Sequence, residues 1–279
     1  MQSSVIEPPS QDNWVHSKKY VELLPSKTKI AYLELGSSSS SVIIFIHGLG
    51  DTSRSFSPII KHFTSFHCYL LDLPGFGNSS EVTGPIKDLK DFLEDIVSFM
   101  NILKIPKAHF VGHSLGSHIS QGMAMIYPER VESISLLGTC IITPQPLLLE
   151  IYKRSKDFKE YPDEQFVEEW TTTDLPIDEI FTKYLKEETK TTKTNTWRSV
   201  LKGMLTTDFS LFTTDITCKT LIIHGTADSL FDEASQEEIR KKLPHASYIS
   251  ISSAGHNLHW EKPNEVAISI DNFLKNNKN

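Results

Sequence analysis

Short apolar runs limit this chain of 279 residues to a sheet whose strands are covered on both faces. The clearest run is VIIFI at 42–46, and related runs lie at 68–71, 108–111, 134–137 and 220–223. A strand with one solvated face alternates apolar and polar residues, whereas the strands of a parallel sheet are buried on both sides and do not alternate. The runs therefore predict the strands of a mostly parallel sheet.

Helical patterns separate these runs. Apolar residues recur every three to four positions from 86 to 100, and shorter helical patterns follow at 115–127 and 237–243. Pro263 stands where a last helix should begin. Strands that alternate with helices indicate an α/β domain. Residues 20–23 and 30–35 flank a turn-rich break, which predicts an antiparallel hairpin before the first buried strand.

The alternation stops between 141 and 215, where helical patterns and aromatic residues dominate. A segment of this length is too long for an ordinary loop, so we expect a helical insertion over one edge of the sheet. The chain is thus predicted to have three parts: a flexible N-terminal tail at 1–17, a core made of 18–140 and 216–279, and the insertion at 141–215.

Composition excludes several classes of protein. Lys and Arg total 28 and Asp and Glu total 35, a formal net charge of −7 that argues against a nucleic-acid-binding protein. The first residues lack the apolar core of a signal peptide, and no stretch approaches 18 apolar residues, so we expect a cytoplasmic protein without a membrane span. The three cysteines lie far apart and have no metal-ligand spacing, which predicts neither a disulfide framework nor a zinc site.

The strongest chemical signal is GHSLG at 112–116, a G-x-S-x-G motif directly after a predicted strand and directly before a predicted helix. A sharp turn from strand to helix crowds the residue at the turn. Gly112 and Gly116 relieve this crowding because they lack a Cβ atom. Such a turn lifts the Ser114 hydroxyl above the sheet, next to the free N–H groups of the helix. Ser114 is therefore the candidate nucleophile.

A serine hydroxyl needs a base to become a nucleophile at neutral pH. Of the eleven histidines, His256 is the best candidate because it follows Gly255 in a loop of small residues. This loop comes after a weaker, alternating strand predicted at 248–251, the last in the chain. Such a loop can place an imidazole over the strand ends without steric conflict. His259 is the alternative.

The imidazole in turn needs an acceptor that fixes its tautomer, usually a carboxylate. Asp228 follows the buried run at 220–223 and is the first choice, with Asp232 as the alternative. The order Ser114, Asp228, His256 along the chain is the nucleophile–acid–base order that accompanies this kind of turn in one fold.

Acyl transfer also needs donors for the developing oxyanion. The N–H of Leu115, immediately after the nucleophile, is one candidate. The N–H of Leu49, in the loop that ends the first buried strand, is the other. Gly48 and Gly50 flank Leu49 and let the backbone approach a substrate closely, so Gly48 is predicted to contact the substrate.

These motifs, together with DLPGFG at 72–77, make the chain resemble the α/β-hydrolases from about residue 20 to residue 275. The resemblance implies a mostly parallel eight-stranded sheet flanked by helices, a Ser–His–Asp triad, and a helical cap at 141–215 inserted after strand 6. Family members that open epoxides or displace halide carry a carboxylate at the elbow, so a serine at position 114 argues against those activities.

We therefore expect a serine hydrolase that cleaves small carboxylic esters, with lactones and thioesters as related substrates, through an acyl-enzyme on Ser114. No cofactor or metal is required. The aromatic residues of the insertion favour a substrate with an apolar group in an enclosed pocket. His113, Trp170 and Trp197 are the further candidates for substrate binding.

Two alternatives remain open at the level of sequence. The loop GHNLHWE at 255–261 is similar to that of hydrolases that cleave a carbon–carbon bond in vinylogous diketones, and Arg198 could bind a substrate carboxylate there. A ligand receptor that keeps the fold with little turnover is the other, since a fold does not dictate function. The sequence does not predict the natural substrate or the oligomeric state.

Overall fold

The computed structural model describes residues 7–37, 40–208, 210 and 213–276. Within them the strands form one eight-stranded sheet of order β1-β2-β4-β3-β5-β6-β7-β8. The strands are β1 Lys19–Glu22, β2 Lys29–Leu35, β3 Val42–Ile46, β4 His67–Leu71, β5 Ala108–His113, β6 Val131–Leu137, β7 Lys219–Gly225 and β8 Ser247–Ile251. The hairpin of β1 and β2 and the pairing of β2 with β4 are antiparallel, and every pairing from β4 to β8 is parallel. The predicted mostly parallel α/β sheet is confirmed.

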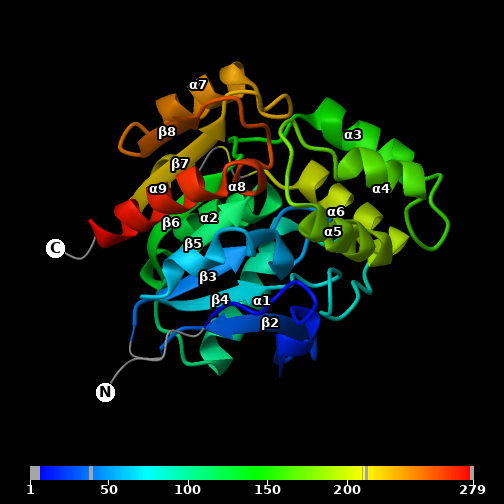
Figure 1. Cartoon of the computed structure of the whole chain (residues 1–279), viewed down its shortest axis with the longest axis horizontal. Helices are drawn as coiled ribbons and strands as arrows, with labels where there is room; N and C mark the ends of the chain where they lie inside the picture. Colours follow the sequence, from blue (N-terminus) through cyan, green and yellow to red (C-terminus); the bar gives the residue numbers. More distant parts are fainter. Residues whose placement is uncertain (1–6, 38–39, 209, 211–212, 277–279) are drawn as a thin grey trace.

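Helices cover both faces of this sheet (Figure 1). The described α-helices are α1 Leu89–Ile102, α2 Leu115–Ile126, α3 Gln145–Arg154, α4 Glu164–Trp170, α5 Glu179–Thr191, α6 Thr194–Thr206, α7 Glu233–Lys242, α8 Leu258–Glu261 and α9 Pro263–Lys275. Short 3-10 helices include η1 Val15–Ser17, η2 Ser53–Phe56 and η3 Ile60–Phe63. As predicted, the last of the α-helices begins at Pro263.

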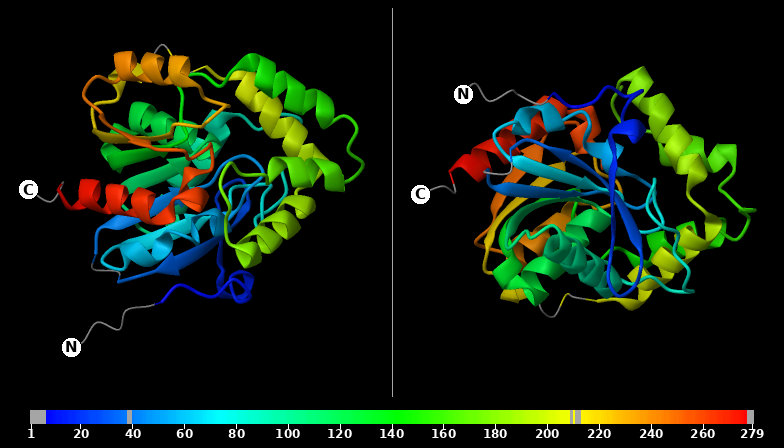
Figure 2. Two further views of the ribbon diagram at one scale, coloured as in Figure 1. Left: turned by 45° about the horizontal axis from the view of Figure 1, so that its top comes forward. Right: turned by 90° about the horizontal axis from the view of Figure 1, so that it is seen from below.

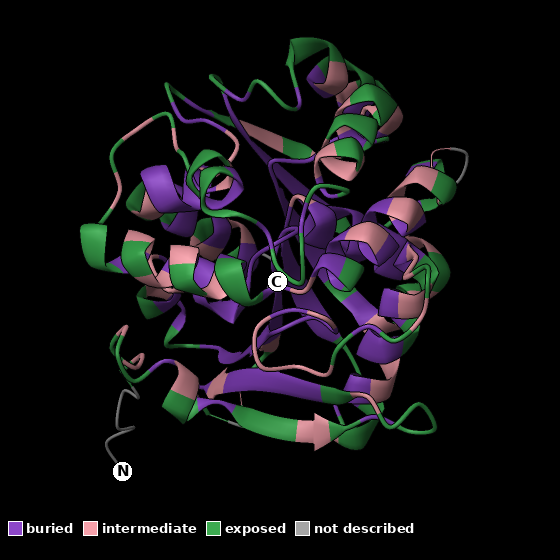
Figure 3. Cartoon of the chain, turned by 90° about the vertical axis from the view of Figure 1, so that its right-hand side faces the viewer, coloured by how far each residue is buried: buried purple, intermediate pink, exposed green. Residues whose placement is uncertain are grey.

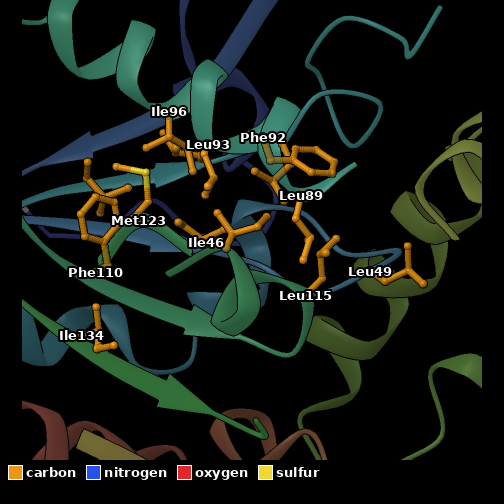
Figure 4. Close-up of a cluster of buried hydrophobic side chains, with 14 of the residues drawn as sticks. Ile46, Leu49, Leu89, Phe92, Leu93, Ile96, Phe110, Leu115, Met123 and Ile134 are labelled. Atoms are coloured by element: carbon orange, nitrogen blue, oxygen red, sulfur yellow. The ribbon is translucent and has the colours of Figure 1, made fainter. Parts of the chain in front are cut away.

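The central strands are buried on both faces, which explains their lack of alternation. On one face Ile44 and Phe110 pack with residues of α1, α2 and α7, and on the other Phe45 and Val111 pack with η2, η3 and α9. Figure 3 shows the buried strands through the middle of the molecule and exposed residues on the outer sides of the helices. Figure 4 shows part of the first cluster, which extends from Ile134 to Leu49 and Leu115 near the ends of the strands.

The four helices α3–α6 form what we call the helical segment, between β6 and β7 in the chain. They lie together beside the sheet (Figures 1 and 2). A Cβ atom on Gly50, Gly75 or Gly255 would lie within 3 Å of side chains of the segment or of its internal loops. These glycines belong to loops that follow β3, β4 and β8, so the segment packs over the carboxyl ends of the strands.

Residues 7–17 differ from the expected flexible tail, whose residues 1–6 lie outside the described part of the chain. Trp14 is fully buried, and its indole N–H donates to the Ser53 hydroxyl at 3.2 Å. Just beyond, the buried Lys18 ammonium lies 2.7 Å from the Asp72 carboxylate. A buried aromatic ring and a buried ion pair hold this stretch against the core, because both would be costly to expose or separate.

The described residues also bear on membrane spans, metal sites and the cysteines. Within the described ranges, no helix is both long and apolar enough to cross a bilayer, and no group of three or more His, Cys, Asp or Glu is arranged to hold a metal ion. Cys68 and Cys140 are buried free thiols, and Cys218 is a half-buried one.

Candidate active site

Ser114 lies in a strained turn between β5 and α2. Its backbone has φ +52° and ψ −115°, a conformation that non-glycine residues seldom adopt. A Cβ on Gly112 would lie 2.2 Å from the carbonyl oxygen of Gly116, and a Cβ on Gly116 would lie 2.0 Å from that of Ile46. Only glycine fits at either position, which is the steric reason for the motif.

Asp228 and His256 are brought into direct contact, although 28 residues separate them in the chain. The Nδ1 atom of His256 lies 2.9 Å from Oδ2 of Asp228. The other oxygen of Asp228 accepts the backbone N–H groups of Leu230 and Phe231 at 2.9 and 3.0 Å. The carboxylate is thus fixed on one side and free to orient the imidazole on the other.

The electrostatics of Asp228 favour its ionised form. Burial opposes the charge, but the bond to His256 and the two backbone N–H donors outweigh burial and lower the pKa of Asp228 below its usual value. The carboxylate therefore stays negative at neutral pH and can stabilise an imidazolium on His256.

Backbone hydrogen bonds join the loops that carry these two residues. The N–H of Thr226 donates to Ile251, and that of Ala227 donates to Ala254 at 2.8 Å. Gly225 has no room for a side chain, since a Cβ there would lie 2.3 Å from the carbonyl oxygen of Ala254. The acid loop after β7 and the histidine loop after β8 are held as one unit.

The His256 ring lies beside the elbow. Its side chain is 13% exposed, it packs edge-on against Phe231 at 4.9 Å between ring centroids, and Gly138 at the end of β6 faces it. No hydrogen bond joins the Ser114 hydroxyl to the ring among the described residues. Hydrogen bonds of this kind are often long before substrate binds.

The two predicted oxyanion donors flank the elbow. Leu115 opens α2, so its N–H is one of the four that have no acceptor inside the helix. Leu49 lies in the loop after β3, where a Cβ on Gly48 would come within 3.3 Å of the Ser114 Cβ atom. The Leu49 loop and Ser114 are therefore neighbours, as the predicted oxyanion site requires.

His47 stabilises this loop. Its ring accepts the N–H of Leu73 at 2.9 Å and donates to the carbonyl of Gly48 at 2.7 Å. Burial lowers the pKa of His47 to about 4, so the ring is neutral and structural.

The predicted substrate-binding residues have different positions. Gly48 lies against the side chain of Ser114. Trp170 and Trp197 pack edge to face, and both face Gly50, whose φ of +78° and lack of a side chain allow the contact. Trp197 is fully buried, whereas Trp170 is half-buried. His113 is 2% exposed, and its Nε2 atom lies 3.1 Å from the carbonyl oxygen of His256, so its ring contacts the backbone of the histidine loop.

The alternative residues are engaged elsewhere. Asp232 caps α7 by accepting the N–H of Ser235, and His259 lies in a buried contact with Ser55 at 2.9 Å. Arg198 donates to the carbonyls of Ser155 and Lys156 at the end of α3, so its guanidinium is occupied within the helical segment.

Sequence reasoning missed two buried carboxyl groups around the site. Asp51 directly follows the Leu49 loop and is 4% exposed, and Glu261 accepts the N–H of Gly255 at 2.7 Å. Glu261 also accepts the N–H of Asp174 in the helical segment at 3.3 Å. Their positions next to the HGLG and GH motifs were the available signal, but an acid in a loop is more often exposed than buried.

Comparison with known proteins agrees with the fold. A family model described as the alpha/beta hydrolase fold matches residues 41–171 and 164–263. The chain is 22% identical over 259 residues to (E)-2-((N-methylformamido)methylene)succinate hydrolase of Acinetobacter baylyi, covering 88% of this chain and 93% of that protein. Two solved structures share the fold. An enol-lactonase from Burkholderia xenovorans has a TM-score of 0.80 at 18% identity, covering 92% of this chain and 100% of the other. An esterase from Exiguobacterium antarcticum has a TM-score of 0.82 at 15% identity, covering 92% and 99%.

The family model covers well over half of the chain, and its two matched ranges contain the elbow, the acid loop and the histidine loop. The chain belongs to the alpha/beta hydrolase fold family.

Proposed function

We propose that this member of the family is a serine hydrolase of small carboxylic esters, lactones and thioesters included, with Ser114, Asp228 and His256 as its triad. The observation that carries the proposal is the 2.9 Å contact between His256 and Asp228 beside a strained serine elbow. A buried acid that orients an imidazole next to a serine held in an unfavourable backbone conformation suits acyl transfer.

The proposed reaction has two steps. His256 takes the proton of Ser114 as Oγ attacks the ester carbonyl, and the N–H groups of Leu49 and Leu115 stabilise the oxyanion. His256 then protonates the leaving alcohol. Water, activated by the same imidazole, releases the acid from the acyl-enzyme. No metal or cofactor takes part in these steps.

The substrate proposed is a small molecule with an apolar group. The half-buried Trp170 lies over Gly50, next to the proposed oxyanion donor Leu49, and is proposed to contact that group together with Gly48. The fully buried Trp197 packs edge to face against Trp170 and is proposed to support it. An enol-lactonase and an esterase among the structural neighbours lend support to ester chemistry. The Nε and Nη2 atoms of Arg198 donate to backbone carbonyls within the helical segment, so no contact favours this residue as the cation for carbon–carbon cleavage. A cytoplasmic location remains the expectation.

The test is hydrolysis of 4-nitrophenyl acetate and butyrate by the wild-type protein and by Ser114→Ala. We expect the variant to lose at least about 10³-fold in kcat, because the nucleophile is removed. The wild type should also react with a fluorophosphonate probe, and Ser114→Ala should not. Ser252→Ala, at an exposed serine of the histidine loop, is the control and should keep both properties. Undiminished turnover by Ser114→Ala would refute the mechanism, and an unlabelled, inactive wild type would favour the receptor alternative.

A further inference from the structure

A second histidine lies directly behind the proposed base. His113 ends β5, one residue before the nucleophile, and its Nε2 atom lies 3.1 Å from the carbonyl oxygen of His256. A carbonyl oxygen can only accept, so Nε2 of His113 must carry the hydrogen. Burial, with the nearby rings of His259 and His256, holds the pKa of His113 well below its usual value. The ring is neutral, and its Nδ1 atom carries no proton.

The His113 ring is confined on several sides. The His259 ring lies 4.4 Å away and the His256 ring 5.0 Å away, measured between centroids. A Cβ on Gly48 would lie 2.9 Å from Nδ1 of His113, and Oδ2 of Asp51 lies 3.9 Å from the same atom. Because these groups surround a ring that is 2% exposed, its N–H can point in only one direction.

The hydrogen bond from His113 restrains the backbone carbonyl of His256, which Asp228 does not contact. His256 stands between β8 and α8, outside regular secondary structure, and follows a glycine. The bond to Asp228 sets the rotation of the imidazole, and the backbone of the loop is held at Ala254 and Gly255, before His256 in the chain. The hydrogen bond to the carbonyl of His256 adds a restraint at His256 itself. Since His113 adjoins Ser114, the restraint joins the base directly to the nucleophile.

We propose that His113 is a positioning residue that holds the His256 loop at the distance from Ser114 that proton transfer requires. The proposal rests on the role proposed above for His256 as the base. It replaces substrate binding as the function of His113, because the ring is buried and its donor is used by the protein itself.

Substitutions at position 113 give distinct expectations. His113→Ala removes the donor, so kcat for 4-nitrophenyl butyrate should fall about 10- to 100-fold, as expected for a small displacement of a catalytic group, with KM nearly unchanged. His113→Gln can place an amide N–H where Nε2 stood and should recover most of the rate. His113→Asn is too short to reach the carbonyl and should not. His67→Ala is the control, since that buried histidine of β4 pairs with Glu34 away from the site.

Proton NMR can detect the same restraint on His256 without a measurement of turnover. The Nδ1–H of His256, bonded to Asp228, should give a low-field resonance that is identified by its loss in His256→Gln. The resonance should shift or broaden in His113→Ala and His113→Asn and persist in His113→Gln and His67→Ala. Wild-type kcat together with an unchanged resonance in His113→Ala would overturn the proposal, as would a rate loss that lies wholly in KM.

The outcomes separate this proposal from the proposed function. If His113→Ala does not fold, the Gln and Asn variants decide, and equal kcat and equal resonances in those two variants would overturn the positioning role. If the wild type neither hydrolyses esters nor reacts with the fluorophosphonate, the proposed function fails. The NMR comparison would still show whether His113 restrains His256.

Discussion

The sheet and the helical segment are held in place by different kinds of contact. The strands pair through backbone hydrogen bonds in fixed register, and apolar side chains fill both faces. The helical segment touches the loops after the strands through aromatic and charged side chains. Arg54 of η2, for example, donates to Glu188 of α5 at 2.8 Å and to the backbone of Gln11 at the N-terminus.

This difference separates the chemistry of the proposed site from the stability and substrate preference of the molecule. The proposed triad belongs to the ends of β5, β7 and β8, where backbone pairing fixes each loop. The helical segment meets the site through Trp170 and Trp197 above Gly50 and through Asp174, which lies against Gly255 of the histidine loop. We therefore expect substitutions at the strand ends to abolish the chemistry while the fold persists. Substitutions between the segment and the loops should change stability and substrate preference more than the chemical step.

The largest effect is expected at the strand ends, for Asp228→Asn. The amide cannot favour the His256 tautomer that serves as a base, and a comparable change in a serine protease lowers kcat by about 10⁴-fold. We expect a loss of similar size, measured with 4-nitrophenyl butyrate, with the far-UV circular dichroism of the folded protein retained.

Asp232→Asn is the matched control for this prediction. Asp232 is the neighbouring acid, and it caps α7 rather than contacting His256. Because asparagine caps a helix about as well as aspartate does, this variant should keep both its stability and its kcat. Equal kcat losses in the two variants would contradict the assignment of Asp228.

A smaller effect on activity but a clear one on stability is expected for Arg54→Met. The Arg54 side chain is 2% exposed, and it also stacks over the rings of Trp14 and Tyr184. Its loss leaves the Glu188 carboxylate, 13% exposed, without its cation, which should cost about 3 kcal/mol in the free energy of unfolding by urea.

The double variant Arg54→Met with Glu188→Met tests the cause of this loss. Removing both charges should recover part of the lost stability, because no buried charge is left unpaired. Both variants should change kcat far less than Asp228→Asn does. A kcat loss as large as that of Asp228→Asn would break the proposed separation between the sheet and the segment.

A change in stability that depends on pH is expected for Asp51→Asn at the border between the two regions. Burial and the nearby Glu188 charge raise the pKa of Asp51 to about 7, against the hydrogen bond from Ser55, which lowers it. The folded protein therefore holds a proton that the unfolded chain releases near pH 4. This contribution to stability is complete below that value and is lost as the pH rises toward 7.

Asparagine imitates the protonated acid at every pH. Relative to the wild type, the stability of Asp51→Asn should therefore increase from pH 4.5 to pH 8, as measured by urea unfolding at both values. His113, 3.9 Å from the carboxyl group, stays neutral between these values because burial holds its pKa well below the usual one. Glu188, whose charge raises the pKa of Asp51, is present in both proteins. A difference that is the same at both values would show that Asp51 is ionised throughout.

The sequence alone determined the fold class and the candidates for the triad. Val42–Ile46 predicts a doubly covered strand because burial on both faces leaves no reason for polar residues. The two glycines around Ser114 predict the elbow because only they tolerate carbonyl oxygens about 2 Å from a Cβ position. These are local constraints, and a local constraint is visible in a short stretch of sequence.

Tertiary structure alone decided the parts that depend on partners distant in the chain. Trp14 looked like part of a loose tail because nothing nearby in sequence shows that its ring contacts Ser53 and Arg54. His113 looked like a residue facing the substrate, yet its ring lies against a carbonyl that comes 143 residues later in the chain. A side chain's partner depends on which distant segment the fold brings next to it. The neighbouring residues in the sequence carry little information about that segment.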